Sequence, residues 1–320
     1  MLRRFRVELD SGEVAGISFG EPTQPTQALF LHANGFNAMT YQSILQPLGN
    51  MWHVSAIDLR GHGRTRLETD PKKLKSWNVF RDDVIQVIEK IAPEGLVLAG
   101  HSMGATIAML VAGKRPDLVK GIVLADPVIL SPLSYMAFHI PLLSSLIGSQ
   151  IPQAKGSLKR RVDFSSSDEA ESNLAGRGAF KTWRTPFLID YLSDGLVPTD
   201  GVACRLACDP AWEAACFKSQ RNRPWSALHS MKKQRYPFIL LQAEKNSTSI
   251  SDIDERIHAF RPDAAVTRVP GTTHFLPMER PYVLRDAIKI LVETAAGLND
   301  GTDYLGAVKR TINASIGQIY

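Results

Sequence analysis

Short apolar runs alternate with helical patterns in the first part of the chain. The runs cover residues 28–32, 52–58, 96–100 and 121–125. Between them Val84, Ile88 and Ile91 recur at helical spacing, and residues 103–113 combine small and apolar side chains. Because parallel strands need helical crossovers to connect them, this alternation predicts a parallel sheet with helices on its faces.

The pattern changes after Asp126 and returns near residue 237. The intervening stretch is rich in Trp, Arg and Ser and has no clear strand pattern, whereas strands are predicted again at 237–243 and 264–269, followed by a helix from about 279 to 295. We therefore expect a discontinuous core and a mostly helical cap inserted into it. The expected division is 1–127 and 237–298 for the core, 128–236 for the cap, and 299–320 for a polar C-terminal tail with no assigned role.

One uncharged segment resembles a membrane span in its hydropathy. No Asp, Glu, Lys or Arg occurs in residues 127–154, and residues 128–147 are strongly apolar. Pro132, Pro141, His139 and four serines interrupt this stretch. An apolar lid or a pair of cap helices is therefore favoured, and no stable membrane span is expected.

The composition is that of a folded globular protein. Apolar residues make up 44% of the 320 residues, and 37 Lys and Arg against 32 Asp and Glu give a net charge of +5. This excess is too dispersed for a nucleic-acid-binding face, so no nucleic acid partner is expected. The N-terminus lacks the apolar core of a secretory signal, which favours a cytoplasmic location. The sequence predicts no particular oligomeric state.

The cysteines and the known cofactor motifs add no cofactor or metal. Cys204, Cys208 and Cys216 lack companion histidines at the spacing of a zinc site, so they are expected to be reduced thiols. The chain has no GxxxxGK[ST], HExxH or strand-linked GxGxxG motif. The chemistry is therefore expected to need neither a cofactor nor a metal.

The most specific chemical signal is Gly-His-Ser-Met-Gly at residues 100–104. A strand pattern leads into it and a helix pattern leaves it. Such a strand-to-helix turn, a nucleophile elbow, tolerates only small residues around it and exposes a serine hydroxyl above the sheet. Ser102 is therefore the candidate nucleophile.

Three further motifs accompany this turn. They are His-Ala-Asn-Gly-Phe at 32–36, Asp-Leu-Arg-Gly-His-Gly-Arg-Thr at 58–65, and Gly-Thr-Thr-His at 271–274. With them, the chain resembles the α/β-hydrolase fold family over most of residues 28–127 and 237–295. The resemblance implies a mostly parallel central sheet with helices on both faces and an inserted helical cap, in which the cap shapes the substrate pocket.

A serine hydroxyl at its free pKa is a poor nucleophile and needs a base within hydrogen-bonding reach. His274 lies in a Gly-containing loop after the last predicted strand, where the family has its catalytic histidine. The resemblance makes His32, His62 and His101 structural supports of neighbouring loops. We therefore take His274 as the general base.

The acid that orients the histidine departs from the usual family pattern. An aspartate usually follows the strand that here covers 237–243, but Asn246 occupies that place. Some relatives carry the acid after the preceding strand, and here that residue is Asp126. Asp126 keeps the chain order of serine, acid and histidine, and a carboxylate also stabilises the imidazolium. We favour Asp126, with Asn246 and Asp252, together with Asp254 and Glu244, as alternatives near the usual place.

An oxyanion that forms on an acyl carbon must be met by N–H donors. By resemblance one donor is the amide of Met103, the residue after the nucleophile. The second belongs to the loop 32–36, with Phe36 as first choice and Asn34 as second.

These residues favour hydrolysis of carboxylic esters through an acyl-enzyme formed on Ser102. The same triad could support acyl transfer or carbon–carbon bond hydrolysis, and a ligand-binding protein without turnover is a further alternative. Trp183 and Tyr191 are candidates for the pocket wall. The uncharged stretch in the expected cap favours a small-molecule substrate with an apolar acyl or aromatic group.

Overall fold

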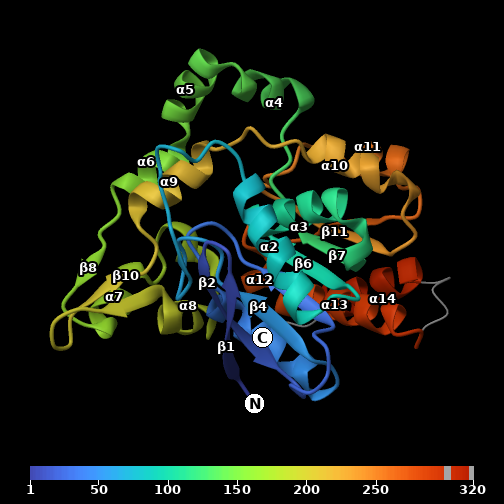
Figure 1. The fold of residues 1–320 in the computed structure, drawn as a ribbon, viewed down its shortest axis with the longest axis horizontal. Coiled ribbons are helices and arrows are strands. Elements are labelled where there is room, and N and C mark those ends of the chain that lie inside the picture. The colour runs from blue at the N-terminus through green and yellow to red at the C-terminus, as the bar shows by residue number, and fades with distance from the viewer. Residues whose placement is uncertain (299–303, 317–320) are drawn as a thin grey trace.

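A computed structural model describes residues 1–298 and 304–316 of the chain. Its centre is one sheet with the strand order β1-β2-β4-β3-β6-β7-β11-β12 (Figure 1). The strands are β1 (Arg3–Leu9), β2 (Gly12–Phe19), β3 (Ala28–Leu31), β4 (Val54–Ile57), β6 (Leu96–His101), β7 (Val119–Ala125), β11 (Phe238–Ala243) and β12 (Ala265–Val269), with β5 (Arg66–Leu67) paired to β2. All pairs from β4 to β12 are parallel. The predicted mostly parallel α/β sheet is confirmed.

Helices cover both faces of this sheet because its central strands are apolar on both sides. Val97 and Ala99 of β6 belong to the core cluster that includes α13 (Pro281–Ala295), whereas Leu96 and Leu98 belong to the cluster with α2 (Asn78–Ile91) and α3 (Met103–Lys114). Successive strand residues point to opposite faces, so a strand buried on both sides needs apolar residues throughout. This is the pattern that made β6 and β7 predictable.

The remaining helices of the core are short. They are α1 (Gln42–Leu45), α11 (Ile253–Phe260), α12 (Leu276–Glu279) and the 3₁₀ turns Ala38–Tyr41, Gln46–Asn50 and Pro116–Leu118. A final helix, α14 (Tyr304–Ile316), packs against α13 and β12. It lies within the segment expected as a polar tail, of which residues 299–303 and 317–320 fall outside the described residues.

The chain between β7 and β11 is largely helical. Its helices are α4 (Pro132–His139), α5 (Pro141–Gln150), α6 (Pro152–Leu158), α7 (Ser167–Leu174), α8 (Phe187–Gly195), α9 (Pro210–Lys218) and α10 (Pro224–Ser230), with 3₁₀ turns at Gly178–Thr182 and Met231–Lys233. It also contains a small antiparallel sheet of β8 (Asp163–Phe164), β10 (Cys204–Leu206) and β9 (Leu196–Pro198). These strands are too short to show an alternating pattern in the sequence.

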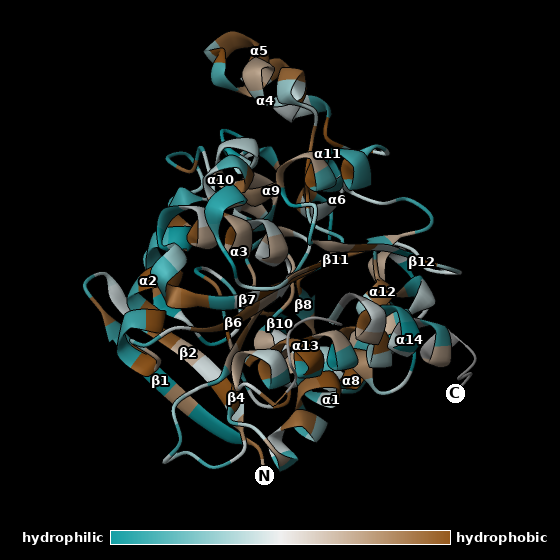
Figure 2. Cartoon of the chain, turned by 90° about the vertical axis from the view of Figure 1, so that its right-hand side faces the viewer, coloured by the Kyte–Doolittle hydropathy of each residue, from teal (hydrophilic) through white to brown (hydrophobic). Residues whose placement is uncertain are grey.

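The uncharged segment forms two short helices, α4 and α5, which project from the rest of the molecule (Figures 1 and 2). A proline begins each of them and separates them, as expected for residues that cannot continue a helix. Within the described part of the chain, no helix is long and apolar enough to cross a membrane.

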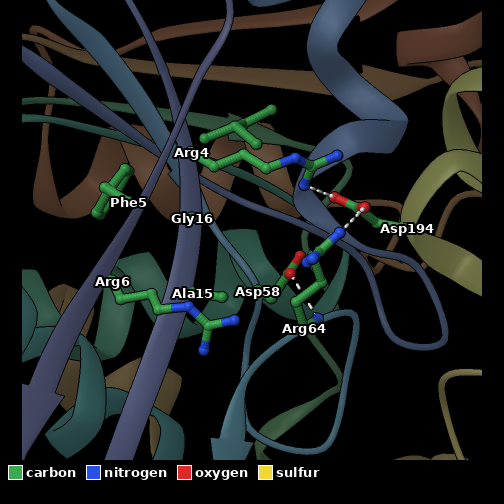
Figure 3. A pocket seen from close by; sticks show the side chains of 9 residues that line it. Arg4, Phe5, Arg6, Ala15, Gly16, Asp58, Arg64 and Asp194 are labelled. Carbon is green, nitrogen blue, oxygen red and sulfur yellow. Dashed lines mark hydrogen bonds and ion pairs between the residues drawn. The ribbon is translucent and has the colours of Figure 1, made fainter. Parts of the chain in front are cut away.

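An ion-pair cluster connects α8 to the N-terminal side of the sheet. The Asp194 carboxylate, at the end of α8, accepts hydrogen bonds from Arg4 of β1 and from Arg64 of the loop after β4. Figure 3 shows both guanidinium groups directed at this carboxylate, beside a cavity of about 240 Å³ that Asp58 also lines. The Asp194 side chain is 1% exposed, so the two arginines replace the water contacts that its carboxylate loses on burial.

Replacing Asp194 tests this connection. Asp194→Asn removes the charge that both arginines contact, and we expect it to lower the free energy of unfolding by about 1–2 kcal/mol, because the arginines themselves are half exposed. The measurement is urea denaturation, with the exposed Asp200→Asn as matched control. Equal urea midpoints for Asp194→Asn and Asp200→Asn would show that the ion-pair cluster does not stabilise the position of α8.

Candidate active site

The turn at Ser102 is forced by two close backbone approaches. A Cβ atom on Gly104 would lie 2.2 Å from the carbonyl oxygen of Leu31, and one on Gly100 would lie 2.5 Å from the Gly104 carbonyl carbon. Only glycine fits at either place. Ser102 itself has a φ of 56° and a ψ of −119°, a conformation that costs a non-glycine residue about 1–3 kcal/mol. The hydroxyl is thereby placed at the end of β6, above the start of α3.

Three side chains from separate parts of the chain form a hydrogen-bonded series with this hydroxyl. Ser102 Oγ lies 2.9 Å from His274 Nε2, and His274 Nδ1 lies 2.6 Å from Asp126 Oδ2. They follow β6, β7 and β12, whose carboxyl ends meet at one edge of the parallel sheet. With Nδ1 donating to the carboxylate, Nε2 is free to accept the proton of the serine hydroxyl.

The Asp126 carboxylate is fully buried and is held by several donors. Oδ1 accepts from the Ala243 amide at 2.9 Å and from the Ser247 hydroxyl at 2.7 Å, and Oδ2 accepts from the Thr248 amide at 3.0 Å. Burial opposes ionisation, but His274 and these donors outweigh it, so the pKa of Asp126 lies below its ordinary value. Asp126 is therefore a carboxylate at neutral pH.

The alternative acids do not contact His274. Asn246 has a positive φ of 54° in the turn after β11, and no hydrogen bond joins it to the histidine. Asp252 is 41% exposed and pairs with Arg256 at 2.7 Å. The loop after β11 instead supplies Ser247 and Thr248, which the sequence reasoning missed. The only available signal was a run of short hydroxyl residues, 247–249, after the usual position of the acid.

His101 links the base to the loop that follows β3. The Tyr41 hydroxyl lies 2.7 Å from His101 Nδ1 and accepts from the Ala33 amide, while His101 Nε2 lies 2.7 Å from the His274 carbonyl oxygen. The carbonyl can only accept, so Nε2 donates and Nδ1 accepts from Tyr41. Burial and then the neighbouring His274 lower the pKa of His101 to about 3, which keeps it neutral.

His32 and His62 support the same region. His32 Nε2 accepts from the Leu59 amide at 2.9 Å, and His62 Nε2 accepts from the Gly35 amide at 3.0 Å. Burial lowers the pKa of His62 to about 4, so its ring can act as this acceptor at neutral pH. Each ring ties the loop after β3 to the loop after β4.

The amides near Ser102 differ in whether they are already bonded. Phe36 donates its amide to the Ala33 carbonyl at 3.1 Å. Within the described residues, neither the Asn34 backbone N–H nor the Met103 backbone N–H has an acceptor, and Met103 is the first residue of α3, ahead of the helical ladder. Met103 and Asn34 therefore offer free donors.

An aromatic cluster adjoins His274. The Trp183 ring centroid lies 4.9 Å from that of Phe36 and 6.2 Å from those of Tyr191 and Phe275. The Phe275 ring lies 5.5 Å from the His274 ring. Trp183 Nε1 is buried without a hydrogen-bond partner in the described structure. The two residues expected in the pocket wall thus belong to one apolar cluster beside the histidine.

One charged pair lies against the loop after β3. Glu213 of α9 accepts from Arg160 at 2.7 Å, and a Cβ on Gly35 would lie 2.7 Å from Glu213 Oε1. Burial raises the pKa of Glu213, although Arg160 opposes the shift. The Arg160–Glu213 ion pair therefore lies against the loop that carries Asn34.

The described residues contain no group of three His, Cys, Asp or Glu side chains that could hold a metal ion. Cys204, Cys208 and Cys216 are all buried and form no disulfide.

Comparison with protein-family models and with known proteins found similar sequences over most of the chain. Residues 28–287 match the model of a family described as the alpha/beta hydrolase family. The 2-(acetamidomethylene)succinate hydrolase of Mesorhizobium japonicum is 24% identical and aligns over 83% of this chain and 87% of its own. The monoglyceride lipase of Rattus norvegicus is 26% identical over 87% of this chain and 85% of its own.

Solved structures show the same fold. The crystal structure of E-2-(acetamidomethylene)succinate hydrolase superposes with a TM-score of 0.73 at 21% identity, over 92% of this chain and 100% of that one. A thioesterase domain from the curacin biosynthetic pathway superposes with a TM-score of 0.70 at 20% identity, over 90% of this chain and 99% of that one.

The donors around Asp126 predict a pH-dependent contribution to stability. Because the folded-state pKa of Asp126 lies below 3.8, its ionised contacts stabilise the fold above that pH and are lost as the pH falls through the lowered pKa. Ser247→Ala removes one contact and should lower the free energy of unfolding by about 1–2 kcal/mol near neutral pH. This deficit should shrink only as the pH falls through the lowered folded-state pKa of Asp126, where its carboxyl group becomes protonated in the native protein.

Denaturant unfolding at a series of pH values measures the deficit. The exposed Ser226→Ala is the matched control, and its difference from the wild type should not vary with pH. A deficit for Ser247→Ala at pH 7 that is no larger than that of Ser226→Ala would contradict a hydrogen bond from Ser247 to an ionised Asp126.

Proposed function

Because the chain belongs to the alpha/beta hydrolase family, we propose that it is a serine hydrolase that cleaves carboxylic esters through an acyl-enzyme on Ser102. The observation that carries the proposal is the hydrogen-bonded series from Ser102 Oγ through His274 to the Asp126 carboxylate. A nucleophile, a base in contact with it and a buried acid that orients the base are the groups that acyl transfer to serine requires.

The proposed reaction has two halves. Ser102 Oγ attacks the acyl carbon while His274 Nε2 takes the hydroxyl proton, and the Asp126 carboxylate stabilises the imidazolium. The same proton then passes to the oxygen of the departing alcohol as its bond to the acyl carbon breaks. His274 then takes a proton from water as the water oxygen attacks the acyl carbon of the acyl-enzyme. As the carboxylic acid leaves, His274 returns the proton to Ser102 Oγ.

We propose that the backbone N–H groups of Met103 and Asn34 bind the oxyanion. Met103 was the first expected donor, and its free amide supports the assignment. Phe36 was the preferred second donor, but its amide is bonded to the Ala33 carbonyl, which moves the proposal to Asn34. Two converging amides would stabilise the charge that develops on the acyl oxygen.

The acyl group is proposed to lie against the aromatic cluster of Phe36, Trp183, Tyr191 and Phe275. This cluster adjoins His274, and Trp183 and Tyr191 come from the inserted segment that we propose as the cap, residues 128–236. Aromatic rings bind apolar chains and rings through large contact areas. A substrate with an apolar acyl or aromatic group therefore fits best.

A second candidate is hydrolysis of an amide that carries carboxylate groups. One relative is named for the substrate 2-(acetamidomethylene)succinate, which has both features in its name. The observation that favours this candidate here is the Arg160 guanidinium, held by Glu213 beside the loop of Asn34. Arginine matches the planar geometry of a carboxylate. Arg160→Gln should then weaken turnover of a carboxylate-bearing substrate and spare an uncharged ester.

The primary test is labelling with a fluorophosphonate probe, followed by peptide mass spectrometry. We expect one adduct, on Ser102, and none in Ser102→Ala, whose thermal unfolding should match the wild type. Asp126→Asn should lower the rate of ester hydrolysis by orders of magnitude, about 10⁴ in the worked serine-protease case. Asn246→Ala serves as the matched control, because Asn246 occupies the usual acid position without contacting His274.

Four outcomes would count against the proposal. An adduct at another residue would remove Ser102 as nucleophile, and a larger loss in Asn246→Ala than in Asp126→Asn would remove Asp126 as the acid. Labelling without turnover of any ester in a substrate series would favour a ligand-binding role. Product partitioning toward an added alcohol would favour acyl transfer over hydrolysis.

A further inference from the structure

The projecting helix pair α4–α5 concentrates exposed apolar side chains. Six of the thirteen large apolar residues that are exposed in the described chain fall within residues 133–146. They are Leu133 (75% exposed), Met136 (64%), Ile140 (55%), Leu142 (74%), Leu143 (37%) and Leu146 (58%). Figure 2 shows these helices standing apart from the body of the protein, with hydrophobic residues most evident in α5.

Contacts on the inner side of the helix pair hold it against the rest of the protein. The same side chains therefore stay on its exposed side. Tyr135 and Phe138 are buried, and the Tyr135 hydroxyl donates to the Val128 carbonyl at 3.1 Å. Trp225 of α10 donates its indole N–H to the Leu130 carbonyl at 2.9 Å. Six exposed large apolar side chains on one anchored element mark a site of interaction.

Cationic side chains surround the base of the pair. Arg221 donates to the Phe138 carbonyl at the end of α4 at 3.0 Å, Lys218 packs beside Gly148 of α5, and Lys155 donates to Gln150 at 2.9 Å. Residues 127–154 contain no Asp or Glu. We call the six exposed apolar residues of α4–α5 the apolar tip. This tip therefore stands above a basic collar formed by Lys155, Lys218 and Arg221.

We infer that α4–α5 is a docking element for an anionic lipid surface, with the apolar tip inserted among the acyl chains and the basic collar on the head groups. A short apolar element with cations at its polar boundary has the two attractions that hold a protein on a membrane surface. The element is convex and lies on the surface, consistent with helices too short to span a membrane.

Charge argues against a second copy of the chain as the occupant. A symmetric contact between two tips would bring two basic collars together, and the chain already carries a net charge of +5. Anionic head groups complement the collar, whereas the same collar on a second copy repels it. The inference concerns binding alone and does not rest on the proposed function.

The test is cosedimentation of the full chain with vesicles. The wild type should bind phosphatidylcholine vesicles that contain about one third phosphatidylglycerol, and bind pure phosphatidylcholine more weakly. Leu142→Ser with Leu146→Ser should lower the partition coefficient by about tenfold to a hundredfold. The matched control is Met51→Ser with Val202→Ser, two comparably exposed apolar residues elsewhere, which should bind as the wild type does.

A second variant separates the collar from the tip. Lys155→Gln with Lys218→Gln should remove most of the preference for anionic vesicles and its salt dependence, and leave binding to phosphatidylcholine unchanged. Thermal unfolding checks that each variant is folded. Ser102→Ala should bind vesicles fully, so a failure of the proposed catalysis would leave this result intact.

Several results would overturn the inference. They are a wild type that binds neither vesicle, tip and control variants that bind equally, and a concentration-dependent dimer in light scattering that the tip variant abolishes. The last result would make the face a contact between copies of the chain.

Discussion

The backbone of α3 approaches β3 so closely at Gly104 that no side chain fits between them. The carbonyl oxygen of Leu31 occupies the space a Cβ would need, and Gly100 meets the same helix start from β6. This contact fixes the angle at which the chain leaves the sheet, and Ser102 must adopt a strained conformation to make the turn. The strain persists because β6 and α3 are buried almost throughout. The position of every other group in the candidate site is set relative to this turn.

The candidate acid illustrates how one function can be divided between two strand ends. Asp126 extends from β7, while the loop after β11 provides the Ser247 and Thr248 groups that hold its carboxylate. β7 and β11 are adjacent and parallel, so the two loops emerge side by side. A carboxylate from one loop and its donors from the next therefore reach the same place, and the histidine can be oriented from either strand.

The parts of the fold that were predictable from sequence are those whose burial is uniform. The central strands are apolar on both faces, and their runs appear directly in the sequence. The β1–β2 hairpin was not predicted, although Phe5, Val7 and Leu9 of β1 alternate with charged residues, as a strand with one buried face does. The strands β8 to β10, with two or three residues each, were too short to show a period.

The residues of the candidate site also fall into those that the sequence predicts and those that it does not. Ser102 and His274 were predicted from motifs with a local backbone requirement, and Asp126 from the resemblance to relatives that carry the acid after the preceding strand. The roles of Tyr41, Ser247 and Thr248 depend on contacts between distant segments, which no local pattern encodes. The choice between Asn34 and Phe36 depends on one turn hydrogen bond, which appears only in three dimensions.

The three thiols have a practical consequence. Cys204, Cys208 and Cys216 all lie in the segment inserted between β7 and β11, all are buried, and burial raises the pKa of each thiol. Alkylating reagents react with accessible thiolates. The rate at which the native protein is alkylated therefore measures how often this segment opens, either locally or with the whole fold, and it needs no engineered label.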